Sequence, residues 1–364
     1  MSMFPVLELS GGAFERGLRH GRDARGRVER SLRNYRDLFE FCRLPWDEAQ
    51  RRAAPYRDVI GGLDPALLEE MEGVAQGAGR PFSEILALNV RTEILPPGFM
   101  AGKDVGECTS IAVAPSASAT GGALLAQNWD WVGVQRESLV LLRFRGRDGL
   151  DCLTLAEGGM LAKIGCNSAG FGVCLNILRS RRDGEKPGAP VHVFLRMLLG
   201  CRTVAEAIAL ASRLSFAGSS NAHCADRGGD AAALECSPYG LRVLKGEGGT
   251  LCHTNHFVDP SAKAWEGELS PALSTESRLA CAEQHAASRA KHGVEDLKRL
   301  LRDESDGLTS ICRHPDRRAP AQLQIESVAS VIMELDRAVM HVAPDVPSRC
   351  DYEAVAVAPE AVPA

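Results

Sequence analysis

The sequence predicts an α+β protein built in layers, and three observations support this fold class. The first hundred residues carry apolar positions at helical spacing. Between about residues 110 and 177, short apolar runs alternate with glycine and polar turns, which is typical of an antiparallel meander. Helical stretches and further strands then alternate towards the end. Strands, then helices, then strands indicate sheets with helices packed outside them.

The leading segment is expected to hold at least three helices. An apolar stripe spans residues 28–42 between charged positions. Asp64 followed by Pro65 is an N-cap with proline at the first helical position, and this second helix is expected to stop at the glycines at 77 and 79. Ser83 is expected to cap a third helix.

The remainder is expected to form strands interrupted by helices. The expected strands are 110–113, 123–131, 139–144, 152–156, 161–166, 171–177, 231–235, 241–244, 250–257, 328–335 and 339–343. Residues 165–170 are interpreted as a hairpin turn. Helices are expected over 191–199, after a capping box at 203–206, and over about 275–301. The Pro- and Ala-rich end after residue 352 is expected to be a loose tail.

Composition excludes several functional classes. The 364-residue chain has a net charge of −5, with no long basic run or basic face carrying aromatic residues, which argues against nucleic-acid binding. No apolar stretch reaches the roughly 18 residues that a membrane span needs. The start lacks a basic and then apolar secretion signal, so a cytoplasmic location is expected.

Cysteine and histidine spacing argues against a metal site. The chain has twelve cysteines but no Cys-x-x-Cys pair, so most are expected to be small buried apolar residues. His253 and His256 are three residues apart on an expected strand, where their side chains would point to opposite faces. The sequence therefore predicts no metal.

Cys108 is the most informative residue for function. It opens a short apolar and β-branched run, follows Gly106-Glu107, and precedes two hydroxyl residues. If the Glu107–Cys108 peptide were cut, the new α-amine of Cys108 could act as the base for its own thiol. The thiolate would make the cut itself, by an N→S acyl shift and hydrolysis of the resulting thioester. This pattern predicts a self-processing cysteine hydrolase or acyltransferase that acts on an amide.

Several blocks in a fixed order support this reading. They are Glu15-Arg16-Gly17-Leu18-Arg19-His20-Gly21, Leu88-Asn89-Val90-Arg91-Thr92-Glu93, Glu107-Cys108-Thr109-Ser110, Gln127-Asn128-Trp129-Asp130, Lys163-Ile164-Gly165-Cys166-Asn167-Ser168-Ala169-Gly170, His253-Thr254-Asn255-His256-Phe257, Ser310-Ile311-Cys312-Arg313-His314-Pro315 and residues 328–344. Together they resemble the acyl-coenzyme A:6-aminopenicillanic acid acyltransferase family, a cysteine-type branch of the N-terminal nucleophile (Ntn) hydrolases. The resemblance covers roughly residues 8 to 350.

The resemblance implies a four-layer αββα sandwich, with two largely antiparallel sheets between helical layers. It implies cleavage into a helical chain, 1–107, and a catalytic chain, 108–364, that remain together as a heterodimer. Cys108 then corresponds to the nucleophile, and Asp130 to the aspartate that holds the cysteine amine. Asn255 corresponds to an oxyanion-hole amide, and Arg313 to an active-site arginine. The implied substrate is a small amide, with acyl-coenzyme A as an optional co-substrate and no bound cofactor.

Two alternatives remain open at the level of sequence. Many family members carry glycine before the cysteine, whereas this chain carries Glu107, which bears on the rate of self-cleavage. A papain-like Cys-His pair could use His253, His256 or His314 as base without self-cleavage. A degenerate member could keep the fold as a binding protein.

Overall fold

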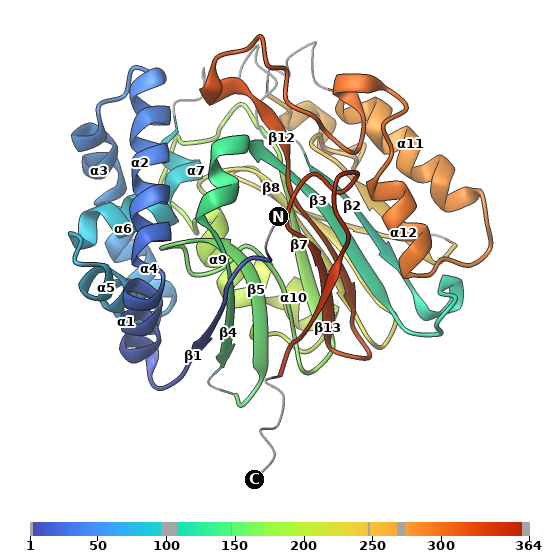
Figure 1. Cartoon of the computed structure of the whole chain (residues 1–364), viewed down its shortest axis with the longest axis horizontal. Coiled ribbons are helices and arrows are strands. Elements are labelled where there is room, and N and C mark those ends of the chain that lie inside the picture. Colours follow the sequence, from blue (N-terminus) through green and yellow to red (C-terminus); the bar gives the residue numbers. More distant parts are fainter. Residues whose placement is uncertain (1–2, 96–107, 147, 247, 268–273, 359–364) are drawn as a thin grey trace.

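Two stacked β-sheets form the centre of the molecule, and helices cover their outer faces (Figure 1). The computed structural model describes residues 3–95, 108–146, 148–246, 248–267 and 274–358. Short runs of β-branched and apolar residues account for the strands, since alternate side chains pack on the two faces of each sheet. The α+β sandwich expected from the sequence is confirmed.

The eight-stranded sheet is antiparallel except at one edge, where β1 runs parallel to β4. Its strands in spatial order are β1 (Val6–Leu9), β4 (Leu139–Arg145), β5 (Asp151–Glu157), β6 (Ile164–Asn167), β7 (Phe171–Ile177), β8 (Ser220–Asp226), β9 (Ala231–Ser237) and β10 (Gly240–Lys245). Because β1 belongs to the leading segment, that segment contributes to the sheet as well as to the helices.

The six-stranded sheet is antiparallel throughout. Its strands in spatial order are β11 (Thr250–His253), β2 (Cys108–Val113), β3 (Leu124–Val132), β12 (Ile325–Glu334), β13 (Val339–Ala343) and β14 (Glu353–Ala356). All residues of β2, β3 and β12 are buried. These three strands therefore form a rigid base on which side chains can be held in fixed positions.

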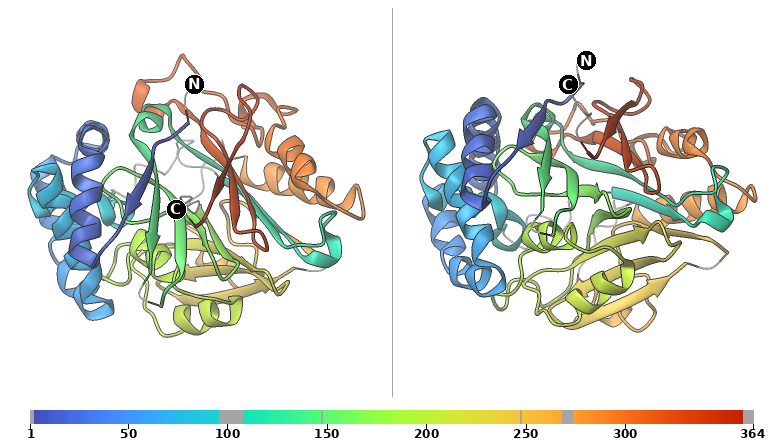
Figure 2. Two further views of the ribbon diagram at one scale, coloured as in Figure 1. Left: turned by 60° about the horizontal axis from the view of Figure 1, so that its bottom comes forward. Right: turned by 90° about the horizontal axis from the view of Figure 1, so that it is seen from below.

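Helices complete the four layers. Helices α9 (Val191–Leu198) and α10 (Val204–Ala211) bury their apolar faces on the eight-stranded sheet. On the other side, α11 (Thr275–Ala287) and α12 (Val294–Leu301) cover the six-stranded sheet. Figure 2 shows the two helical layers on opposite sides of the stacked sheets.

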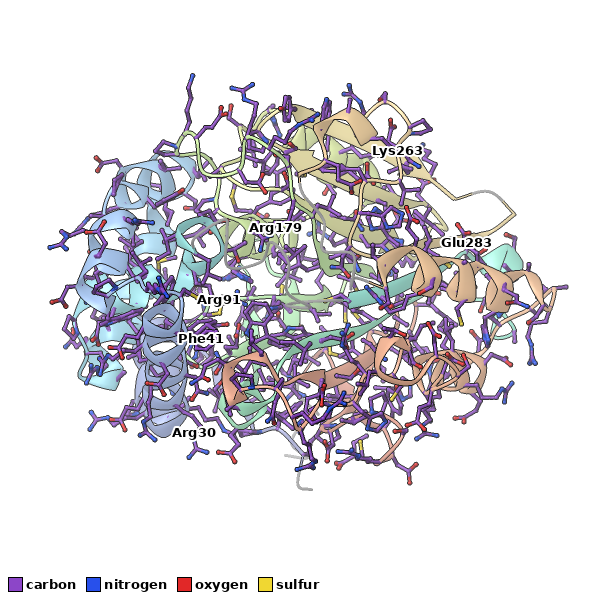
Figure 3. All side chains as sticks on the ribbon, turned by 90° about the horizontal axis from the view of Figure 1, so that it is seen from above. Arg30, Phe41, Arg91, Arg179, Lys263 and Glu283 are labelled. Carbon is purple, nitrogen blue, oxygen red and sulfur yellow. The ribbon has the colours of Figure 1, made fainter. Side chains whose placement is uncertain are left out.

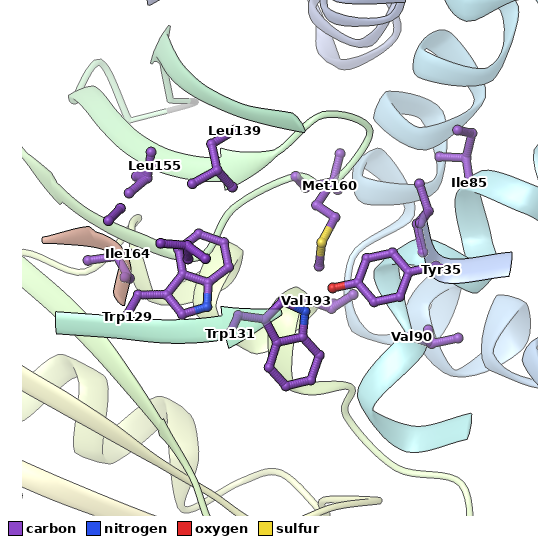
Figure 4. Packing of buried hydrophobic residues seen from close by; sticks show 14 of the residues in the cluster. Tyr35, Ile85, Val90, Trp129, Trp131, Leu139, Leu155, Met160, Ile164 and Val193 are labelled. Atoms are coloured by element: carbon purple, nitrogen blue, oxygen red, sulfur yellow. The ribbon is translucent and has the colours of Figure 1, made fainter. Parts of the chain in front are cut away.

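The leading helices form a separate cluster beside the sandwich, drawn in blue in Figures 1 and 2. They are α1 (Ala13–Asp23), α2 (Arg25–Phe41), α3 (Trp46–Ala53), α4 (Tyr56–Leu63), α5 (Pro65–Ala78), α6 (Phe82–Asn89) and α7 (Arg91–Ile94). Their apolar side chains share one core with the space between the sheets, including Tyr35, Trp129 and Trp131. Figure 4 shows Met160 in the space between Trp129 and Tyr35.

Glycines bring α1 and α5 into backbone contact. A Cβ atom on Gly17 would lie 1.9 Å from the carbonyl oxygen of Glu70, and one on Gly73 would lie 2.1 Å from that of Phe14. Real Cβ atoms do not approach other atoms so closely. Only glycine therefore allows this helix crossing.

Several local expectations are confirmed. The Asp64 carboxylate caps α5 by accepting from the amide of Ala66 at 3.1 Å, and Gly79 ends this helix with φ 66°. Thr203 caps α10 by accepting from the amide of Glu206 at 3.2 Å. A hairpin turn does join β6 and β7, but only residues 168–170 form it, because 165–167 belong to β6.

Other expectations are wrong. Strands β1 and β8 fall where none was expected. The end is also not loose throughout, because β14 pairs with β13. Helix α6 begins after Pro81, and the hydroxyl of Ser83 donates to Gln50 instead of capping the helix. The expected helical region 275–301 is two helices, and the expected strand 250–257 ends at His253.

All twelve cysteines lie in the described residues as free thiols, and nine of them are buried. Among the described residues, no helix has the length and apolar character that a membrane span requires.

Candidate active site

Cys108 is the first residue of β2 and is only 4 % exposed. It pairs with Trp129 across the antiparallel strands β2 and β3, so the two side chains lie on the same face of the six-stranded sheet. Both side chains belong to the core cluster between the sheets. The thiol is therefore enclosed between the two sheets, close to the leading helices that share that core.

Asn255 holds the backbone nitrogen of Cys108. The N–H of Cys108 donates to Asn255 Oδ1 at 2.7 Å, while Asn255 Nδ2 donates to the carbonyl of Ile177 at 3.0 Å. The Asn255 amide N–H in turn donates to the hydroxyl of Thr275 at 2.7 Å, which fixes the loop after β11. The side-chain oxygen of Asn255 thus faces the nucleophile, and its NH₂ group faces Ile177.

Arg278 is a site residue that the sequence analysis missed. It lies in the second turn of α11 and is 1 % exposed. Its Nη1 donates to the carbonyl of Cys108 at 2.9 Å and to the hydroxyl of Thr109 at 2.8 Å, and its Nη2 donates to Asn255 Oδ1 at 3.1 Å. The planar guanidinium therefore fixes the nucleophile's backbone and the asparagine together.

The carbonyl of Cys108 has a second donor from the opposite sheet. Asn176 Nδ2, on β7, lies 3.1 Å from that oxygen. The hydroxyl of Ser110 donates to Asn176 Oδ1 at 2.8 Å and also lies 2.8 Å from His223 Nδ1. This buried network links the two sheets through the nucleophile's strand.

Asp130 and Arg313 are joined through Ser327. The Ser327 hydroxyl donates to Asp130 Oδ1 at 2.6 Å, and the backbone N–H of Arg313 donates to the same hydroxyl oxygen at 3.0 Å. Asp130 is fully buried and Arg313 is 3 % exposed. Arg313 also lines a surface cavity with His314, Leu323 and other residues, which include none of Cys108, Asp130 and Asn255.

The Cys108 thiol is not activated in this form of the chain. Burial and the nearby Asp130 carboxylate raise its pKa to about 11, whereas Lys163, the backbone N–H of Asp130 and Arg278 act in the opposite direction. A thiol with such a pKa is almost entirely protonated near neutral pH. Nucleophilic attack therefore requires a proton acceptor.

Lys163 is a second residue whose role the sequence did not reveal. It directly precedes β6, is 4 % exposed, and holds its ammonium 3.7 Å from the centre of the Trp129 ring. Burial, and next the charge of Arg91, lower its pKa to about 7. Figure 3 shows Arg91 where the leading helices meet the sheets.

The histidines of the papain-like alternative have other partners. His253 Nε2 lies 2.9 Å from Glu235 Oε1, and His256 Nδ1 lies 2.9 Å from the Thr275 hydroxyl. His314 Nε2 lies 2.5 Å from Glu304 Oε1. Within the described part of the chain, none of the three makes a hydrogen bond to Cys108.

One group of metal-ligand type is present in the described residues. The side chains of Glu304, Cys312 and His314 place one ligand atom each within 4.8 Å of one another. However, Arg349 Nη2 donates to His314 Nδ1 at 2.8 Å and sets a positive charge beside the ring. A cation at this position would be repelled, so we assign it no role in the site.

The structure therefore brings the site residues together to different degrees. Cys108 and Asn255 are in direct contact, whereas Asp130 acts on the thiol through its charge and its backbone N–H. Arg313 reaches this group through Ser327. Glu107, the other residue of the proposed cleavage bond, lies outside the described residues.

Comparisons with known proteins agree on one family. The family model "Acyl-coenzyme A:6-aminopenicillanic acid acyl-transferase" matches residues 118–321. The 40 kDa form of acyl-coenzyme A:6-aminopenicillanic-acid-acyltransferase from Emericella nidulans is 32% identical over 320 residues, which cover 84% of this chain and 84% of the relative.

Similar solved structures include two hydrolases at low identity. Penicillin V acylase from Agrobacterium tumefaciens has a TM-score of 0.47 and 16% identity, over 65% of this chain and 82% of that chain. A conjugated bile acid hydrolase from Clostridium perfringens has a TM-score of 0.45 and 12% identity, over 68% of this chain and 92% of that chain.

Proposed function

Because the chain belongs to the acyl-coenzyme A:6-aminopenicillanic acid acyltransferase family, whose members are enzymes of amide hydrolysis and N-acyl transfer, we propose that it cleaves or transfers the acyl group of a small N-acyl amide through a thioester on Cys108. The observation that carries this proposal is the fixation of both backbone groups of Cys108. Its N–H is held by Asn255 and its carbonyl by Arg278 and Asn176. These partners are side chains from three different segments, not the backbone of a neighbouring strand, and they fix the first residue of β2 in place.

Maturation is the first reaction in this account. The thiol of Cys108 attacks the carbonyl of residue 107, the peptide nitrogen leaves, and water cleaves the thioester. Asn255 Oδ1 already holds the nitrogen that must leave. Holding the reacting atoms in place can supply much of the rate of an intramolecular attack. The products are chains 1–107 and 108–364, which stay together because β1 and the leading helices share the core of the sandwich.

Turnover is the second reaction. The freed α-amine of Cys108, with an ordinary pKa near 7.7–8, accepts the thiol proton during attack on the amide substrate. Asp130 lies close enough for its carboxylate to act on Cys108 and would hold the resulting ammonium. Asn255 would donate its NH₂ group to the oxyanion once that group turns from Ile177.

The family supports a small amide as the substrate class. An acyl-thioester is resolved by water in a hydrolase and by an amine in an acyltransferase, so the same site serves either outcome. We propose a small N-acyl amide as donor, with acyl-coenzyme A as an alternative donor. Arg313, whose charge is fixed and which lines a surface cavity, would contact the polar part of such a substrate.

Trapping of the acyl-enzyme tests this proposal. The matured protein is incubated with a panel of N-acyl amides, with and without acyl-coenzyme A, quenched with acid and measured by mass spectrometry. The proposal predicts a mass increase equal to the acyl group on the chain that begins with Cys108. Cys108→Ala, which has no nucleophile at this position, is the control and should gain no acyl mass. Turnover without any adduct on Cys108, or turnover by the Cys108→Ala variant, would overturn it.

A further inference from the structure

Self-cleavage lacks the base that turnover uses. Before the peptide is cut, the nitrogen of Cys108 is an amide whose hydrogen is held by Asn255 Oδ1. An amide nitrogen cannot accept the thiol proton at neutral pH. We infer that Lys163 is the proton acceptor for the Cys108 thiol in self-cleavage. This inference rests on the proposed function and adds the group that starts its first reaction.

The position of Lys163 supports this role. Its ammonium lies over the ring of Trp129, 3.7 Å from the centre, and Trp129 is the cross-strand partner of Cys108. Side chains of such a pair are neighbours, with Cβ atoms about 4.5–5.5 Å apart. Lys163 thus reaches from the eight-stranded sheet to the ring beside the thiol. Among the described residues no hydrogen bond joins the two groups, so the proton would pass between them through a bridging water.

Burial and the charge of Arg91 favour a neutral amine at Lys163, whereas Glu157 and Cys108 act in the opposite direction. The charged groups that shift the pKa of Lys163 are Arg91 from α7, Glu157 at the end of β5 and Cys108 from β2. The charge of Lys163 in turn lowers the pKa of His192 from α9. Glu157 is already engaged, because Arg91 Nη2 donates to it at 3.1 Å and the Tyr35 hydroxyl donates to its other oxygen. Among the described residues, no carboxylate forms a salt bridge with the ammonium of Lys163.

The electrostatic surroundings of Lys163 agree with its position. Burial and the charge of Arg91 lower the pKa of Lys163 to about 7. At pH 8 most of these side chains are neutral amines that can accept a proton, whereas an exposed lysine is charged. Protonation of Lys163 below pH 7 removes the acceptor. The cleavage rate should therefore fall as the pH drops below about 7.

The step balances without any co-reactant. The Sγ proton of Cys108 moves to Nζ of Lys163, and Sγ bonds to the carbonyl carbon of residue 107. The C–N bond then breaks as Nζ returns the proton to the departing nitrogen of Cys108, which leaves a thioester and a free amine. Water hydrolyses the thioester, gives a carboxyl group on residue 107 and restores the thiol.

Two substitutions separate proton transfer from charge. Lys163→Met removes both, whereas Lys163→Arg keeps a positive charge that cannot act as a base. Lys245→Met, at an exposed position at the end of β10, is the matched control. Each chain is made by cell-free synthesis, and the fraction of two-chain protein is followed by mass spectrometry from pH 5.5 to 9. Thermal unfolding shows whether each variant is folded.

We expect both Lys163 variants to cleave at least about 10²-fold more slowly than wild type, with the rising limb of the pH profile abolished. The control should cleave at the wild-type rate. A Lys163→Arg chain that matures like wild type would overturn the inference, since charge alone would then suffice.

A pre-cut form separates maturation from turnover. Residues 104–107 are replaced by a factor Xa recognition sequence, so that added protease leaves Cys108 at the N-terminus. In this form Lys163→Met should lose turnover through the higher pKa of the thiol, but much less than the loss of about 10²-fold expected for self-cleavage, because the α-amine now serves as base. A loss of turnover after pre-cutting that equals the loss of self-cleavage would contradict the inference. A wild-type chain that never cleaves would count instead against the proposed function.

Discussion

The backbone N–H of Cys108 donates a 2.7 Å hydrogen bond to Oδ1 of Asn255. The asparagine is held in turn by Arg278 Nη2 and by the carbonyl of Ile177. Asn255 thus touches the atom that leaves in self-cleavage. Its amide can later serve the oxyanion of turnover, so one side chain is expected to contribute to both reactions.

Substitution of Asn255 tests this double role. Asn255→Asp keeps an oxygen for the N–H of Cys108 but loses the NH₂ group and sets a carboxylate oxygen against the carbonyl of Ile177. We expect the kcat of the pre-cut enzyme to fall by about 10²–10³-fold, the usual effect of losing an oxyanion donor. Steady-state kinetics measures this loss. An unchanged kcat would exclude Asn255 from the oxyanion hole.

Arg278→Lys should weaken the site without removing its charge. A lysine cannot reach the carbonyl of Cys108, the Thr109 hydroxyl and Asn255 Oδ1 at the same time. Buried acceptors left without donors cost about 1–3 kcal/mol. We expect a lower free energy of unfolding in urea and slower self-cleavage. Arg289→Lys, which is exposed, is the control and should change neither.

Gly73→Ala should destabilise the leading helices. The added methyl would lie 2.1 Å from the carbonyl oxygen of Phe14, so α1 and α5 must move apart. Overpacking of this kind costs about 1–3 kcal/mol. A methyl on Gly26 of α2 meets no atom within 4 Å, and Gly26→Ala should leave stability unchanged or raise it by up to about 1 kcal/mol. Equal unfolding curves for the two variants would refute the helix contact.

Glu93 should make stability depend on pH. Burial raises its pKa from 4.5 to about 7, so the folded protein keeps this proton to higher pH than the unfolded chain. The stability that the protonated form contributes is present below pH 4.5 and is lost as the pH rises through 7. Glu93→Gln keeps the oxygen that accepts from the Val191 amide, 2.8 Å away in the wild type, and should remove this contribution. The difference in Tm between pH 5 and pH 8 should be smaller in Glu93→Gln than in the wild type. The control Glu295→Gln should show the same difference as the wild type.

Local sequence signals identified much of the fold and part of the site. Cys108, Asp130, Asn255 and Arg313 stand in short blocks that could be compared with a family. Buried strands such as β4 and β7 appear as mostly apolar runs. Strand β8 does not appear as an apolar run. Its inward side chains include Asn221 and His223, which belong to the polar network between the sheets.

The missed residues depend on contacts distant in sequence. Arg278 is 170 residues from Cys108, and nothing in its helical neighbourhood distinguishes it from a surface arginine. Lys163 is distinguished by its burial against Trp129, which only the stacking of two sheets produces. Strand β14 is part-exposed and gains its place from pairing with β13 and from Arg143 Nη2, which donates to the carbonyl of Ala356 at 2.8 Å.

Intact-mass analysis of the purified wild-type protein tests the central claim most directly. The account predicts two chains, one ending at Glu107 and one beginning at Cys108, whereas Cys108→Ala should give one chain of full length. The account would be contradicted by a wild-type protein that remains a single chain and still turns over its amide substrate.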